Sequence, residues 1–218
     1  MFKKFLLILI IFFVTASTAF SDRIPTSSRH IKNYGVGVYK LENDFYVFEK
    51  PDANAKKIRH FYLPSKQNKS AIIRTTENEP YIVSIPSQEN YFVTVSEYPE
   101  EDWLQIYYDE NEKNTGWIKL QDEKNFFTWK DFFYRYGKQN GLAIMRDVPE
   151  TDFRLYSQDN EDSQIIEKFT YPEYIEMRMI RGNWMLVTVV DKGTIYKTGW
   201  FKWRTDEGKL RLFPKFKP

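Results

Sequence analysis

The pentapeptide Thr115-Gly116-Trp117-Ile118-Lys119 returns near the end of the chain as Thr198-Gly199-Trp200-Phe201-Lys202. Each copy follows a second tryptophan and, further upstream, a short aromatic segment, in the same order both times. These preceding features are Phe45–Phe48 and Trp103 for the first copy, and Phe153–Tyr156 and Trp184 for the second. Ordered self-similarity of this kind indicates an internal duplication. The 218-residue chain is therefore predicted to hold two similar modules.

Strand-like periodicity runs through both copies. Ile175–Met179 alternates apolar with charged residues, and Tyr91–Val95 is a short run of residues that favour strands. The segments Asp109–Asn114 and Asp191–Thr194 are rich in turn-forming residues and predict hairpin tips. Clustered aromatics over Phe126–Tyr136 lead into a glycine-containing stretch, which predicts a short helix ending at glycine. The expected fold class is all-β, with two small modules joined by a helical linker.

The predicted boundaries follow from this pattern. They are 1–21 for a signal peptide, 22–38 for an N-terminal extension, 39–125 for the first module, 126–140 for the linker helix and 141–218 for the second module. We expect the second module to fold alone from about Asn140.

The first copy is longer than the second between its aromatic segment and its first tryptophan. We place the extra residues at about 64–90, where polar Ser65–Ser70 precedes a plausible strand at Tyr81–Ile85. Insertions survive in surface loops because the entropy of loop closure rises slowly with length, and such loops often carry function. The alternative is that the insertion covers a sheet edge.

The start of the chain has the pattern of a secretory signal. Lys3-Lys4 precedes an unbroken apolar run, Phe5–Val14, and Ala16–Ser21 offers small residues for cleavage. The apolar run is shorter than the ~18 to 20 residues that span a bilayer, which favours cleavage over a retained anchor. The protein is expected to be secreted, periplasmic or on the cell surface, with no membrane span after cleavage. Losing the two lysines lowers the formal charge from +2 to zero, which removes support for a nucleic-acid partner.

The two copies resemble the bacterial SH3-like domain. The likeness rests on an opening strand with a small turn (Phe48–Asp52; Tyr156–Asn160), then the Asp/Asn-Trp strand, then Thr-Gly-Trp followed by an apolar residue. It covers roughly 39–124 and 141–213, and the first copy departs from it by its insertion. The resemblance implies a small five-to-six-stranded β-barrel, found on exported bacterial proteins and often associated with cell-wall recognition.

The residue inventory argues against catalysis. A Cys-His peptidase needs a thiolate, and the chain has no cysteine. Its two histidines, His30 and His60, do not have the spacing of a zinc site, and small barrels do not hold the paired carboxylates of a glycosidase across a deep cleft. We expect a protein that is not an enzyme and has no metal site and no cofactor.

Strand alternation predicts which aromatic residues bind a ligand. Trp117 and Trp200 each share a strand face with a lysine, while Ile118 and Phe201 lie on the other face. The predicted ligand-binding residues are Trp117, Trp200, Tyr107 and Tyr108. The alternative is that the two tryptophans cover a barrel end or the seam between modules. Two functions remain open: a binding module for peptidoglycan peptide, glycan or an envelope partner, and a structural envelope protein whose duplicated barrels make protein contacts.

Overall fold

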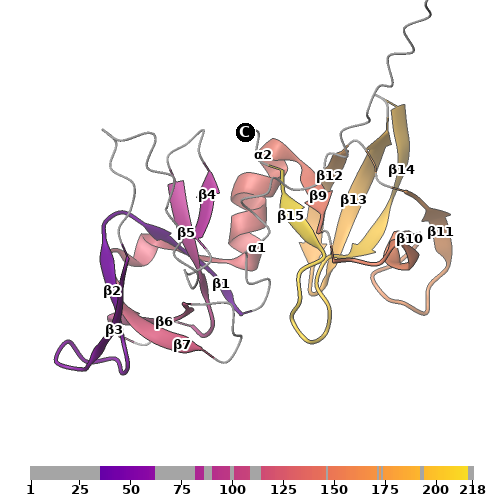
Figure 1. Ribbon diagram of the computed structural model, residues 1–218. Helices are drawn as coiled ribbons and strands as arrows, with labels where there is room; N and C mark the ends of the chain where they lie inside the picture. Colours follow the sequence, from indigo (N-terminus) through magenta and orange to yellow (C-terminus); the bar gives the residue numbers. More distant parts are fainter. Residues whose placement is uncertain are drawn as a thin grey trace, which may run out of the picture.

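The computed structural model describes residues 35–61, 82–85, 90–98, 101–108, 114–145, 147–170, 172, 174–191 and 194–215. The predicted signal peptide and nearly all of the N-terminal extension lie outside these residues. The described chain is mostly β, arranged as two antiparallel sheets with one helical segment between them (Figure 1). Within the described part of the chain, no helix has the length and apolar character needed to cross a membrane.

The first half forms one sheet with strand order β3-β2-β7-β6-β5-β1-β8, and β4 pairs with β5 outside this path. The short 3-10 helix η3 (Glu123–Asn125) precedes β8. The strand bounds are β1 (Gly37–Leu41), β2 (Phe45–Phe48), β3 (Lys57–Phe61), β4 (Ile82–Ile85), β5 (Asn90–Val95), β6 (Trp103–Tyr107), β7 (Thr115–Lys119) and β8 (Phe126–Thr128).

The second half forms a sheet with strand order β11-β10-β14-β13-β12-β9-β15. The short 3-10 helix η5 (Glu150–Asp152) precedes β10. The strand bounds are β9 (Leu142–Ile144), β10 (Arg154–Tyr156), β11 (Ile165–Lys168), β12 (Tyr174–Arg181), β13 (Trp184–Asp191), β14 (Thr194–Lys202) and β15 (Leu212–Pro214).

The two strand orders match element by element once β4 is set aside. The segments that the sequence repeat equates, β2 with β10, β6 with β13 and β7 with β14, occupy the same places in their sheets. The strand β4 confirms the one predicted inside the insertion. Both orders are open, because no described pairing joins β3 to β8 or β11 to β15. The sheets are antiparallel and duplicated, and the finer assignment to SH3-like barrels stays a prediction.

The glycine of the repeated pentapeptide lets two strands approach closely. A Cβ on Gly116 would collide with Val47 Cγ1, and a Cβ on Gly199 would lie 2.9 Å from Leu155 Cβ. Val47 and Leu155 are both fully buried and lie on the equivalent strands β2 and β10. A larger side chain at either glycine would push these strands apart, so the fold itself requires the glycine of the Thr-Gly-Trp pattern.

One strand departs from simple alternation. Ile175 and Met177 on β12 are buried, as the sequence predicts, but the pairing with β13 shifts between Met177 and Met179. Arg178 is the extra residue of this bulge, so the side chains after it point to the opposite faces from those that simple alternation gives. Met179 is therefore 39% exposed, and Ile180 is buried. The alternation predicted through Met179 is therefore wrong for its last residue.

A helical segment follows β8 and consists of α1 (Trp129–Phe132), the π-helical turn η4 (Phe133–Gly137) and α2 (Lys138–Asn140). Thr128 caps its start, because its side chain accepts a hydrogen bond from the Asp131 N–H. It ends before Gly141, whose φ of 72° favours glycine. The predicted linker began at Phe126, but Phe126–Thr128 pairs with β1 as a strand.

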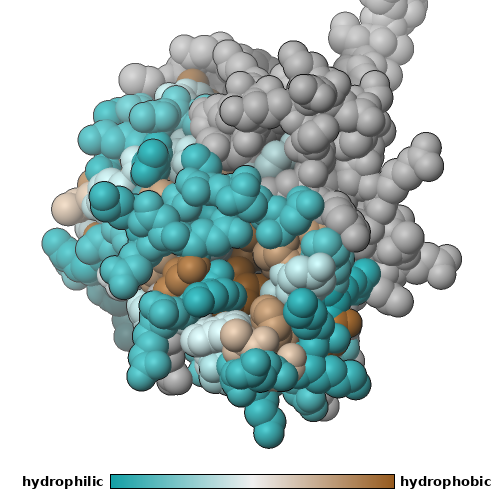
Figure 2. Space-filling view, turned by 90° about the vertical axis from the view of Figure 1, so that its left-hand side faces the viewer, coloured by the Kyte–Doolittle hydropathy of each residue, from teal (hydrophilic) through white to brown (hydrophobic). Residues whose placement is uncertain are grey.

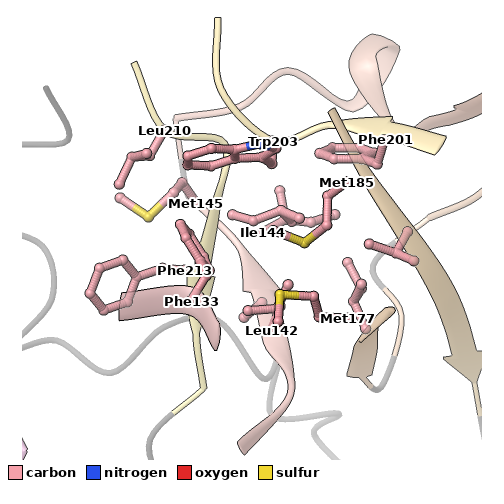
Figure 3. Packing of buried hydrophobic residues seen from close by; sticks show 14 of the residues in the cluster. Phe133, Leu142, Ile144, Met145, Met177, Met185, Phe201, Trp203, Leu210 and Phe213 are labelled. Carbon is pink, nitrogen blue, oxygen red and sulfur yellow. The ribbon is translucent and has the colours of Figure 1, made fainter. Parts of the chain in front are cut away.

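The helical segment is a core element. Its side chains Trp129, Phe132, Phe133 and Tyr136 are buried in one cluster that contains Phe92 and Phe127 of the first half together with the core of the second half. Figure 3 shows Phe133 packed among apolar side chains of the second half. Its ring centroid lies 5.0 Å from that of Trp203.

Further contacts connect the helical segment to both halves. Phe132 lies between the sheets, with ring centroids 5.4 Å from Phe92 and 5.7 Å from Phe213. The guanidinium of Arg204 donates a 2.6 Å hydrogen bond to the Gly35 carbonyl, which joins the two halves directly. A separate cluster, which includes Tyr39, Val47 and Ile118, fills the rest of the first half. The two sheets and the helix therefore form one packed unit.

Candidate functional site

The two strands that carry the repeated pentapeptide have the predicted faces. Ile118 and Phe201 are each 1% exposed and point into the cores. Trp117 and Trp200 are only half-buried, on the opposite faces of β7 and β14. The prediction that these tryptophans are the more exposed residues is confirmed, and their role in ligand binding stays a prediction.

Trp117 has the expected neighbours with one exception. It pairs with Phe48 across β2 and with Gln105 across β6. Tyr107 shares this outer face, because β6 alternates with Leu104 and Ile106 buried inward. Tyr108 does not, because it packs against the core of the first half. The structure brings together Trp117 and Tyr107 and places Tyr108 on the other side of the sheet.

Trp200 lies in an equivalent setting in the second half. It pairs with Tyr156 across β10 and with Leu186 across β13. The guanidinium of Arg181 lies 5.2 Å from the centre of the Trp200 ring, which is the geometry of a cation–π contact. Arg181 is itself held by an ion pair with Asp159, at 3.2 Å.

An edge-to-face aromatic pair recurs beside each of these tryptophans. Phe48 and Trp103 have ring centroids 5.4 Å apart with planes at 85°, and Tyr156 and Trp184 have centroids 5.3 Å apart with planes at 83°. Each pair joins the opening strand to the first Trp strand of its half. Trp103 and Trp184 were predicted only as markers of the repeat. Their matching positions in the two copies were the signal that could have placed them on this face.

The first half extends its aromatic face towards β3. His60 stacks on Tyr46 at 4.0 Å, and the Lys57 ammonium lies 4.1 Å from the same ring. Tyr46 is 39% exposed and lies 6.5 Å from the Phe48 ring. Figure 2 views the molecule from the side of β2 and β3 and shows hydrophobic residues in a depression flanked by hydrophilic ones; on its colour scale, Tyr, Trp and His do not count as hydrophobic. We call the residues His60, Tyr46, Phe48, Trp103 and Trp117 the aromatic row.

The second half adds a charged pocket of about 270 Å³ next to its aromatic pair. Its lining comes from η5, β10, the turn after β10, the end of β14 and the segment before β15. The lining residues are Asp152, Arg154, Tyr156, Glu161, Lys202 and Arg211. Sequence reasoning missed this pocket, because its residues are far apart in the chain and three of them, Asp152, Glu161 and Arg211, lie outside the repeated segments.

Ion pairs hold most of the pocket in place. The Lys202 ammonium lies 2.9 Å from Glu161 and 2.8 Å from Asp206, with its side chain only 11% exposed. Arg211 pairs with Asp152 at 2.9 Å. Partial burial alone would lower the pKa of Lys202, but its hydrogen bonds to Asp206 and Glu161 raise the pKa above the ordinary value. Lys202 therefore stays cationic at neutral pH.

Asp206, on the outer side of this network, has the opposite shift. The hydrogen bond from Lys202 lowers the pKa of its carboxyl, and a hydrogen bond from Asn183 adds to this effect. Lys202 and Asp206 thus both stay charged through the neutral range. Among the described residues, no group of three or more His, Cys, Asp or Glu side chains is placed to hold a metal ion.

No protein-family model matches the sequence, and a search of curated proteins found no match.

Proposed function

We propose that this chain is an exported, non-catalytic SH3-like binding protein of the bacterial cell envelope, which recognises cell-wall peptide or glycan. The observation that supports it best is the recurrence of one aromatic arrangement on both outer faces, where Trp117 and Trp200 lie next to the pairs Phe48–Trp103 and Tyr156–Trp184. Half-exposed aromatic rings offer large contact area to sugars and peptides at little cost in side-chain entropy.

The placement of these rings on strands also supports binding. Side chains on β7 and β14 are held by the sheet and by their aromatic neighbours. Binding a ligand would therefore cost little side-chain conformational entropy. A structural role alone would also retain such rings, and the alternative is a scaffold whose duplicated barrels contact other envelope proteins.

Retention on purified peptidoglycan tests the proposal. The chain without residues 1–21 is expected to bind in a saturable manner, and the double variant Trp117→Ala, Trp200→Ala is expected to lose at least ten-fold in affinity. Tyr98→Ala is the matched control, because Tyr98 is 61% exposed and its ring contacts Phe126, which belongs to neither aromatic face. Equal retention of the double variant and the control would contradict the proposal. Absence of retention together with co-purification of one defined envelope protein would favour the scaffold.

A further inference from the structure

We infer that the charged pocket of the second half binds the carboxylate that ends a peptide, with the neighbouring apolar part of that peptide lying over Tyr156 and Ile165. This inference deepens the proposed function, because it names the ligand class for one of the two faces. The pocket residues and the aromatic face share one side of the sheet: Tyr156 lines the pocket, contacts Trp184 and pairs with Trp200.

The charges of the pocket favour an anion. Its lining contains three cations, Arg154, Lys202 and Arg211, and two carboxylates, Asp152 and Glu161. The ion pairs described above engage both carboxylates with Lys202 and Arg211. Asp206, just outside the lining, also pairs with Lys202. Within the described residues, Arg154 is therefore the one lining cation without a carboxylate partner, and an incoming carboxylate would supply that partner.

Arg154 is the group that meets the ligand. It is half-buried on β10, where its backbone pairs with Lys168, and within the described residues its guanidinium forms no hydrogen bond or ion pair. A planar guanidinium binds a carboxylate through two parallel hydrogen bonds, which is stronger and more specific than a single contact. The fixed ion pairs of Lys202 and Arg211 hold the walls on either side.

The size and surroundings of the pocket favour the end of a peptide. A volume of about 270 Å³ is slightly below the range of pockets that enclose a drug-sized ligand, so it suits a terminal group. Ile165 pairs with Tyr156 across β10 and β11 and is 38% exposed. It adjoins Tyr156 on the same face of the sheet, where the preceding side chain of a bound peptide would lie. An inorganic anion would use the charges and leave this apolar surface unused.

The test is an NMR titration of the purified, ¹⁵N-labelled protein with N-acetyl-lysyl-D-alanyl-D-alanine, which mimics the end of a cell-wall stem peptide. The free acid is expected to shift resonances of β10 and the Arg154 side chain, and its C-terminal amide is expected to bind at least ten-fold more weakly. Inorganic phosphate is the third probe, and it is expected to bind more weakly than the free acid. Equal binding of acid and amide, or tighter binding of phosphate, would overturn the inference.

Two variants assign the effect to Arg154. Arg154→Gln is expected to weaken binding of the free acid at least ten-fold with an unchanged melting temperature, and Arg154→Lys is expected to restore part of the affinity. Lys168→Gln is the matched control: Lys168 pairs with Arg154 across the strands and is exposed, but it does not line the pocket. Unchanged binding in Arg154→Gln, or an equal loss in Lys168→Gln, would overturn the assignment.

This result is separable from the test on peptidoglycan. Wall retention with no binding of the free acid would refute the pocket and leave the proposed function standing. Binding of the free acid without wall retention would support the pocket and refute the recognition of intact wall.

Discussion

At the scale of single residues, the repeated pentapeptide combines three different roles. Its glycine allows the close approach of β2 or β10, its aliphatic or aromatic fourth residue fills a core, and its tryptophan covers the outer face. Alternation along a strand separates the last two roles between opposite faces. Core packing and the outer aromatic face therefore depend on adjacent residues.

This separation predicts different costs for two neighbouring substitutions. Phe201→Ala removes a ring that is 1% exposed and is expected to cost ~3 to 5 kcal/mol, whereas Trp200→Ala removes a half-buried ring and is expected to cost about 1 to 2 kcal/mol. Thermal and denaturant melts of the two variants measure the difference. The pair Ile118→Ala and Trp117→Ala repeats the comparison in the first half, and a larger loss for either tryptophan would contradict the face assignment.

At the scale of elements, β4 is the one described strand without a counterpart in the second half. Residues Ile82–Ile85 of β4 pair with β5. On the same edge of β5, β6 pairs only at Val95. Since the other strands of the two sheets match, the shared architecture is complete without β4.

Removal of this strand is therefore expected to be tolerated. Replacing residues 65–88 with a short Gly-Ser linker is expected to leave a cooperative unfolding transition, with a loss of ~1 to 3 kcal/mol because one edge of β5 becomes exposed. Circular dichroism during thermal melting measures both quantities. A broad, non-cooperative transition would show that the insertion belongs to the core.

The elements differ in how far the sequence could predict them. The strands of the repeated motif, β4 and the helix were predictable, because each depends on local periodicity or on glycine and turn residues. The strand Phe126–Thr128 was not, because its pairing with β1 is a long-range contact, and the exposure of Met179 depends on a bulge that only the partner strand reveals.

The candidate site was predictable in part for the same reason. Trp117, Trp200 and Tyr107 follow from alternation along their own strands, whereas Tyr108 lies past the end of β6 and turns towards the core. The pocket escaped prediction, because Arg154, Lys202 and Arg211 meet only after β10, β14 and the segment before β15 pack together.

At the scale of the whole molecule, the helical segment joins two halves that the sequence presents as separate modules. Its buried rings contact apolar residues of both sheets, and Arg204 adds a direct hydrogen bond between them. The predicted boundary at Asn140 would remove Trp129, Phe132 and Phe133 from the core that they fill.

Two truncated chains test this boundary. Residues 128–218 retain the cap and the helix and are expected to unfold cooperatively, whereas residues 141–218 are expected to lose cooperative unfolding, since each lost buried ring costs ~3 to 5 kcal/mol against a typical domain stability of ~5 to 15 kcal/mol. Thermal melts followed by tryptophan fluorescence compare the cooperativity of unfolding of the two fragments, with the longer fragment as control. Equal stability of the two fragments would show that the helix is a spacer.

The shared core also has a consequence for avidity. Because one packed unit carries both outer faces, their separation and relative orientation are fixed, and neither can swing to reach a second epitope. Under the function proposed above, a polymer that presents its repeat at the matching spacing would engage both faces at once, and the second contact would form at a high effective concentration. A polymer with any other spacing would engage one face at a time and would gain no avidity. The rigid junction would therefore favour ligands whose repeat spacing matches the separation of the two faces.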